Sequence, residues 1–183
     1  MQAYKKGFTL IELLVVIAIL AVLATAVVVI LNPAELVKQG RDSTRISDLA
    51  ALHSAIALYL SDVNGASITS TETCTAALSS PPTNFTCGSI STSTVVTGTG
   101  WAPIDFTDIS SGSPLARLPL DPVNDTTYAY TFQGGSLNTF EIDANMESTK
   151  YASGGGGDVE SNNKDGGNDD TYYEIGNDPG LDL

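Results

Sequence analysis

An uninterrupted apolar stretch near the N-terminus constrains this chain more than any other feature. Residues 8–31 comprise 24 residues with a single charge, Glu12. As an α-helix the stretch would be about 36 Å long, enough to cross a bilayer core of about 30 Å. An ionised carboxylate inside lipid is costly and normally has a partner or a function. The sequence therefore predicts a membrane-spanning helix in which Glu12 has a specific role.

The residues that begin this stretch form a motif. Lys5 and Lys6 are followed by Gly7, then by Phe8, and four residues later by Glu12. This pattern resembles the cleavage and assembly motif of type IV pilins and of the pseudopilins of type II secretion. The resemblance implies that a prepilin peptidase cuts between Gly7 and Phe8 and that the new amine of Phe8 is methylated. It also implies that the helix serves first as anchor and then as filament core.

Simple electrostatics supports the same assignment. Cleavage after Gly7 removes the two lysines, which are the positive-inside anchors of the uncut chain, and exposes an amine that is mostly cationic at neutral pH. The Phe8 amine is then the cation that Glu12 needs, within its own chain or in a neighbouring subunit. Because contacts between two apolar helices tolerate slippage, such a pair would set the axial register.

The resemblance carries expectations about location, partners and function. The chain is expected in the inner (cytoplasmic) membrane as a single-pass precursor, and then in a cell-surface or periplasmic filament. Its expected partners are prepilin peptidase, an inner-membrane assembly platform and further copies of itself. The favoured function is a structural subunit of a type IV pilus-like filament, and the close alternative is a major pseudopilin of a type II secretion system. The remoter alternative is a membrane-anchored calcium-binding or adhesive module, which would need no polymerisation.

Two simpler interpretations explain less of the sequence. A secretory signal peptide could be cut near residues 24–26, but its apolar run would contain Glu12 and continue through residues 27–31. An ordinary membrane anchor would leave the motif as a coincidence. No enzyme is expected, because the chain has one histidine, His53, and neither a Gly-x-Ser-x-Gly motif nor a phosphate-binding loop.

The resemblance and the sequence patterns divide the whole chain into four predicted segments. Residues 1–7 are the predicted leader, 8–31 the transmembrane and filament-core helix, 32–62 an amphipathic helix that continues into the head, and 63–183 a globular head. The head has the size of one ordinary domain. The formal net charge of −13 repels phosphate, which disfavours direct nucleic-acid binding.

Residues 32–62 have the pattern of an amphipathic helix that ends near Ser61. Asn32 and Pro33 form a helix-start pattern, although a proline can also kink one longer helix. Apolar residues recur at steps of three and four, at Leu36, Ile46, Leu49, Leu52, Ile56, Tyr59 and Leu60. Charged residues lie mostly elsewhere on the helix, at Lys38, Arg41, Asp42, Arg45 and Asp48.

The head is expected to have an α+β fold. Strand patterns occur at residues 128–132, 139–142 and 172–175, and the sheet is predicted to begin after the turn-rich residues 118–124. Residues 66–100 are rich in Ser and Thr and are predicted to form a variable loop. The resemblance implies a type IV pilin-like fold: a long N-terminal helix, apolar in its first half and amphipathic in its second, packed on a small antiparallel sheet.

The two cysteines, Cys74 and Cys87, predict a disulfide. In an exported chain, an even count at close spacing favours a bridge over two free thiols. Closing this 14-residue loop would contribute about 3 kcal/mol in the chain-entropy model. A histidine-based metal site is disfavoured, because His53 lies in the amphipathic helix.

A flexible acidic segment near the C-terminus is a candidate calcium site. A hard cation needs several oxygens from a backbone that turns sharply, and residues 154–170 are rich in glycine, carboxylates and amides. The candidate ligands are Asp158, Glu160, Asp165, Asp169 and Asp170. Their spacing does not match an EF-hand, and such segments are commonly only solvated. Some pseudopilins have a calcium site near this part of the chain, and calcium is the one cofactor that the sequence suggests.

Overall fold

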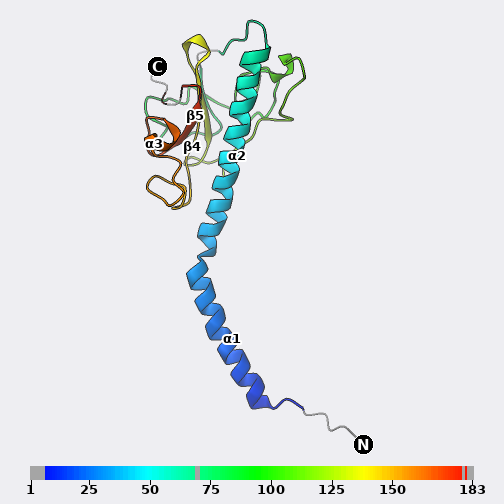
Figure 1. Ribbon diagram of the computed structural model, residues 1–183, viewed down its shortest axis with the longest axis vertical. Coiled ribbons are helices and arrows are strands. Elements are labelled where there is room, and N and C mark those ends of the chain that lie inside the picture. Colours follow the sequence, from blue (N-terminus) through cyan, green and yellow to red (C-terminus); the bar gives the residue numbers. More distant parts are fainter. Residues whose placement is uncertain (1–6, 69–70, 179, 181–183) are drawn as a thin grey trace, which may run out of the picture. The chain divides into compact units, whose positions relative to one another are not determined.

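The computed structural model describes residues 7–68, 71–178 and 180 of the chain. It comprises two compact units, Met1–Val37 and Lys38–Leu183, each of which is described by itself. The helices are α1 (Leu10–Leu31), α2 (Pro33–Asp62) and α3 (Asn162–Asp165), with short 3-10 helices at Phe106–Asp108 and Ser136–Asn138. The strands are β1 (Thr71–Cys74), β2 (Ser89–Ile90), β3 (Tyr130–Gly134), β4 (Phe140–Ala144) and β5 (Tyr173–Gly176) (Figure 1).

The first helix ends where the sequence predicted a new helix start. Asn32 caps α1 with a left-handed backbone (φ 39°, ψ 75°), a conformation that asparagine tolerates better than most residues. Pro33 then opens α2, since proline at the first helical position forgoes no hydrogen bond. The carbonyl of Asn32 accepts from the backbone N–H groups of Glu35 (3.0 Å) and Leu36 (3.3 Å). One residue therefore ends the first helix and begins the second.

The amphipathic half of α2 forms one wall of the head. Its buried apolar residues are Leu49, Leu52, Ala55, Ile56 and Tyr59, at the spacing of one helix face. The helix ends at Asp62, and Gly65 follows with a positive φ of 77°, which glycine adopts without steric cost. Asp62 accepts hydrogen bonds from the backbone and hydroxyl of Ser110 (2.6 and 2.8 Å).

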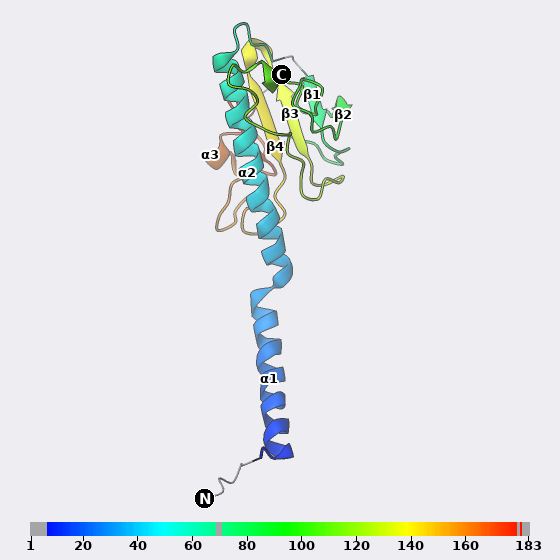
Figure 2. The same ribbon diagram turned by 90° about the vertical axis from the view of Figure 1, so that its right-hand side faces the viewer.

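A five-stranded sheet packs on α2 in the order β2-β1-β3-β4-β5 (Figure 2). The predicted hairpin of β3 and β4 is confirmed, with Phe132 opposite Ile142. The predicted C-terminal strand pairs antiparallel with β4, and β1 pairs antiparallel with β3, whereas β1 and β2 are parallel. The core between helix and sheet includes Trp101, whose indole N–H donates to the Pro119 carbonyl at 2.8 Å.

The prediction that the sheet begins after residues 118–124 is wrong. Residues 66–100, expected to be an irregular loop, contain both β1 and β2. The Ser/Thr-rich composition hides these strands, because their stability comes from strand pairing rather than from local propensity. Strand β1 pairs with β3, about 60 residues away, and β2 pairs with β1. The predicted disulfide is confirmed: Cys74, at the end of β1, is bonded to Cys87, with Cα atoms 5.5 Å apart.

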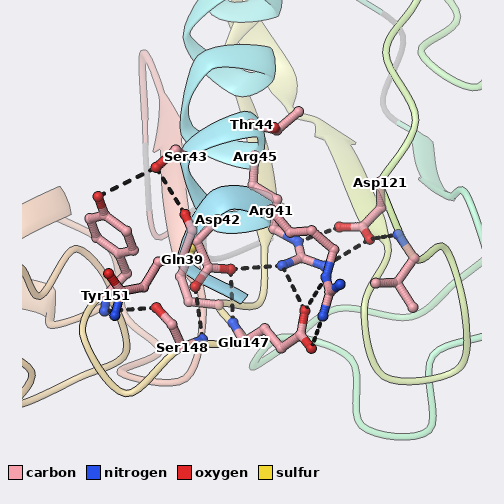
Figure 3. A network of polar contacts seen from close by, with 12 residues as sticks. Gln39, Arg41, Asp42, Ser43, Thr44, Arg45, Asp121, Glu147, Ser148 and Tyr151 are labelled. Carbon is pink, nitrogen blue, oxygen red and sulfur yellow. Dashed lines mark hydrogen bonds and ion pairs between the residues drawn. The ribbon is translucent and has the colours of Figure 1, made fainter. Parts of the chain in front are cut away.

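Two of the charged residues of α2 are buried, although they lie off its apolar face. The side chains of Asp42 and Arg45 are fully buried. Arg45 lies between Asp42, Asp121 and Glu147 (Figure 3). Asp42 accepts from the backbone N–H groups of Glu147 and Ser148 at 2.9 and 2.8 Å. Burial is possible because the loops supply a partner for each charge.

Candidate functional site

The predicted processing site lies in an accessible, non-helical segment. Residues 1–6, including Lys5 and Lys6 of the predicted leader, lie outside the described residues. Gly7 and Phe8 precede α1, and the Phe8 side chain is 82% exposed. A Cβ added at Gly7 would meet no atom within 4 Å, and its φ is not positive. The fold of this chain therefore does not require glycine at position 7, so a requirement for it would come from a processing partner.

The start of α1 is held by a reciprocal pair of residues, Thr9 and Glu12. The Glu12 carboxylate accepts from the Thr9 backbone N–H at 2.8 Å and from its hydroxyl at 2.7 Å. The Thr9 hydroxyl oxygen accepts in return from the Glu12 N–H at 3.3 Å. This arrangement is a capping box, which satisfies amide groups that the first helical turn leaves without partners.

The capping box adds Thr9 to the candidate functional residues, a residue that was not predicted from the sequence. The Thr-x-x-Glu spacing of Thr9 and Glu12 is the sequence signature of this motif, so the signal was present. Because Thr9 satisfies the Glu12 carboxylate within the chain, a cation is not its only partner. Pairing of Glu12 with the Phe8 amine stays a prediction.

The surface of α1 is apolar apart from Glu12 and Thr25. None of its 22 residues is buried. An 18-residue window of the helical segment Leu10–Asp62 has a mean hydropathy of 3.4, so the segment is long and apolar enough to cross a membrane. Exposed apolar surface of this extent requires lipid or other protein chains around it.

The five predicted calcium ligands are held in separate local hydrogen bonds. Asp158 accepts from the backbone N–H groups of Gly154, Glu160 and Ser161, and the Ser161 hydroxyl in particular lowers its pKa to about 2. Glu160 is buried and accepts from the N–H groups of Met146 (2.6 Å) and Ser153 (3.0 Å). Burial nevertheless raises the pKa of Glu160 to about 7.

The other three predicted ligands lie further along the same segment. Asp165 accepts from the N–H groups of Gly167 and Glu174, and Asp169 from Thr83 and Thr171. Asp170 is exposed and accepts from the Asn162 N–H at 2.9 Å. Calcium binding by these five residues stays a prediction.

A different set of acidic residues is brought together by the sheet. Glu141, Asp143 and Glu174, here called the strand carboxylate cluster, each place one carboxylate oxygen within 4.8 Å of the others. Among the residues that the structure describes, none of the five predicted ligands belongs to this cluster. The sequence signal was the Glu-x-Asp alternation in β4, which puts two acids on one face of a strand.

Comparison with known proteins finds a match at the N-terminal end of the chain. Residues 2–28 match the family model described as the prokaryotic N-terminal methylation motif. Neither the curated proteins nor the solved structures contain a match to the chain. The match spans the predicted cleavage point, the capping box and most of α1.

Proposed function

From the N-terminal methylation motif of type IV pilins and pseudopilins that residues 2–28 carry, we propose that this chain is a filament subunit of a type IV pilus-like system. The motif and the pilin-like fold together imply a type IV pilin or pseudopilin subunit. Proteins of this family are structural, and this chain is a structural protein rather than an enzyme.

The observation that carries the proposal is the unburied apolar helix α1 with a carboxylate in its first turn. The helix is long enough to anchor the precursor in the inner membrane, and its 22 residues cover about 33 Å. In a filament the same surface is buried against identical helices of other subunits. The change of surroundings from lipid to protein costs little, because both are apolar.

Proteolytic processing converts the membrane-anchored precursor into a subunit that can join the filament. Cleavage after Gly7 by prepilin peptidase removes the basic leader and creates a cationic N-terminus at Phe8. This amine can pair with Glu12 of a subunit already in the filament, which recruits each new subunit and sets its register. The head, held on α2 by its own core, then lies on the outside of the filament.

The N-terminus of the isolated protein tests the proposal. Mass spectrometry should find a chain that starts with a methylated Phe8, and electron microscopy should find filaments that contain it. A Gly7→Glu variant should accumulate as an uncut precursor in the membrane, since the fold itself has space at this position. A mature chain beginning at residue 1, or at Val27 as a signal-peptide cut requires, would contradict the proposal.

The alternative is a major pseudopilin of a type II secretion system. The feature that favours it is residues 118–122, which resemble a turn seen before the sheet in pseudopilins. A pseudopilus is short and confined to the periplasm or wall, whereas a pilus extends from the cell. Immunogold labelling of intact cells distinguishes the two, since only a surface filament is labelled without permeabilisation.

A further inference from the structure

The strand carboxylate cluster lies on the sheet face that points away from α2. In β4, Phe140, Ile142 and Ala144 belong to the core, so the alternate residues Glu141 and Asp143 point to the opposite face. Glu174 of β5 is the register partner of Asp143. The side chains of Glu141, Asp143 and Glu174 are only 4%, 0% and 1% exposed. Three carboxylates therefore share one buried space.

Two members of the cluster, Asp143 and Glu174, have no compensating positive side chain among the residues that the structure describes. No ion pair in the described part of the chain includes Asp143 or Glu174. The buried arginine, Arg45, pairs instead with Asp42, Asp121 and Glu147. Like charges directly opposite each other on neighbouring strands repel, and burial of an ionised carboxylate is costly. Burial accordingly raises the pKa of Glu174 to about 8 and that of Asp143 well above its usual range.

Each of two cluster carboxylates has one oxygen held by the protein and one without a partner. Asp143 Oδ2 accepts from the Thr131 hydroxyl at 2.5 Å, and Glu174 Oε2 accepts from the Asp169 N–H at 2.9 Å. Asp143 Oδ1 and Glu174 Oε1 are buried and have no hydrogen-bond partner. Buried acceptors of this kind are rare unless a water, ion or ligand satisfies them.

Two further residues shape the same space. Gln133 lies opposite Glu141 in the register and has a buried amide nitrogen without a partner. Turning that amide over would present its oxygen to the cluster instead. On the other side, a Cβ at Gly167 would overlap the Glu174 carboxylate, so the backbone after α3 lies directly against it. Figure 1 shows the sheet between α2 and the segment that carries α3.

We propose that Glu141, Asp143 and Glu174 bind one hard divalent cation, with calcium as the preferred ion, beneath residues 165–170. Oxygens that coordinate one calcium ion at about 2.3–2.6 Å can be at most about 5 Å apart, and the cluster oxygens satisfy this limit. An all-oxygen donor set favours calcium or magnesium over transition metals. Magnesium usually keeps several waters, so a buried cluster under a close-packed backbone favours calcium.

This site differs from the one that the acidic segment suggested. Its ligands come from β4 and β5, and residues 165–170 cover them. A bound cation would link β4 to β5 and remove the mutual repulsion of their carboxylates. Calcium would then stabilise the C-terminal part of the head.

Thermal unfolding of the full chain in detergent tests the proposal, with calcium chloride or a chelator as the only variable. The wild-type midpoint should rise by about 5 to 10 °C when calcium is roughly 100 times its dissociation constant. Asp143→Asn and Glu174→Gln should each abolish this rise. In chelator both variants should be at least as stable as wild type, because they remove a carboxyl whose ionisation is unfavourable in the cluster but keep an acceptor for Thr131 or Asp169.

Asp170→Asn is the matched control, since it removes one exposed acid from the covering segment. It should leave the calcium-dependent rise intact, and equilibrium dialysis should find one calcium ion per chain in this control and in wild type. The proposal is overturned if calcium leaves the wild-type midpoint unchanged, which would mean that protons neutralise the cluster. It is also overturned if both cluster variants keep the rise, or if Asp170→Asn abolishes it.

Discussion

Arg45 and Asp121 are 76 positions apart in the sequence and form a fully buried, bidentate ion pair. Arg45 Nε donates to Asp121 Oδ2 at 2.6 Å and Nη2 donates to Oδ1 at 2.9 Å. Asp121 also accepts from the backbone N–H groups of Val123 and Asn124. The guanidinium lies 4.9 Å from the ring centroid of Tyr128. The pair thus attaches the turn before β3 to the middle of α2.

Breaking this pair should strongly destabilise the head. Arg45→Met leaves Asp42 and Asp121 buried without their cation, and loss of one partner of a buried pair typically costs about 3 to 5 kcal/mol. Denaturant unfolding followed by the fluorescence of Trp101, the single tryptophan, measures the change. Arg117→Met is the control. Arg117 is exposed, so this substitution should lower the free energy of unfolding by no more than about 0.5 kcal/mol. Equal effects of the two variants would show that the buried pair is not important for stability.

The roles of Glu12 in capping and in assembly can be separated by substitution. Glu12→Leu removes both the acceptor and the charge, whereas Glu12→Gln keeps an acceptor for Thr9 and removes only the charge. Thr9→Ala weakens the cap by about 1 kcal/mol and keeps the charge. If the charge recruits subunits, both Glu12 variants should be inserted and cleaved but not assembled, and Thr9→Ala should form filaments.

Filament yield from cells that lack the wild-type gene is the measurement for these three variants. Losing an ion pair in an apolar environment costs a few kcal/mol, which lowers subunit affinity by about two orders of magnitude. Wild-type filament abundance with Glu12→Gln would show that the carboxylate acts through hydrogen bonding alone. If the Thr9→Ala variant fails to assemble, filament formation requires the helix cap that Thr9 and Glu12 form.

The Cys74–Cys87 disulfide should contribute about 3 kcal/mol to the stability of the head, because it restricts a 14-residue loop in the unfolded chain. The double variant Cys74→Ser with Cys87→Ser should unfold at correspondingly lower denaturant, again followed through Trp101. A reductant should destabilise the wild type and leave the double variant unchanged. If the double variant is as stable as the oxidised wild type, strand pairing alone holds the end of β1.

Stability without divalent cations should fall as the pH rises from about 4.5 to about 8. Burial raises the pKa of Glu160 from 4.5 to about 7, so in this window the folded state keeps a proton that the unfolded state has lost. Between pH 4.5 and pH 7, this carboxyl alone should lower the free energy of unfolding by roughly 2 to 3 kcal/mol. Burial also raises the pKa of Glu174 to about 8, which continues the decline in the same direction.

Denaturant unfolding at a series of pH values in chelator measures this decline. Glu160→Gln should flatten the profile below pH 7, and Asp108→Asn, at an exposed position, should leave it unchanged. Asp158, whose pKa the Ser161 hydroxyl lowers to about 2, stabilises the fold above its usual value of 3.8 and loses this effect only at lower pH. A profile that rises between pH 5 and pH 8 would contradict the assignment of buried protonated acids.

Local patterns were sufficient to predict the two N-terminal helices. The apolar run of residues 8–31 specifies a helix without tertiary partners, because the backbone groups in the interior of a helix are satisfied within it. The break at Asn32 and Pro33 follows from the restricted backbone of proline. The hairpin of β3 and β4 and the bridge between Cys74 and Cys87 also involve partners close in sequence, so their spacing was informative.

Tertiary structure alone decided which polar residues are buried. Arg45 has the helical position of a solvated charge and is buried because Asp121 and Glu147 arrive from loops far along the chain. Strand β1 exists because β3 offers it a partner, and the strand carboxylate cluster forms because the register places Asp143 opposite Glu174. Periodicity in a sequence reports the preferred face of one element at a time. The free energy of a buried charge depends on what other elements bring to it, and that is set only when the chain folds.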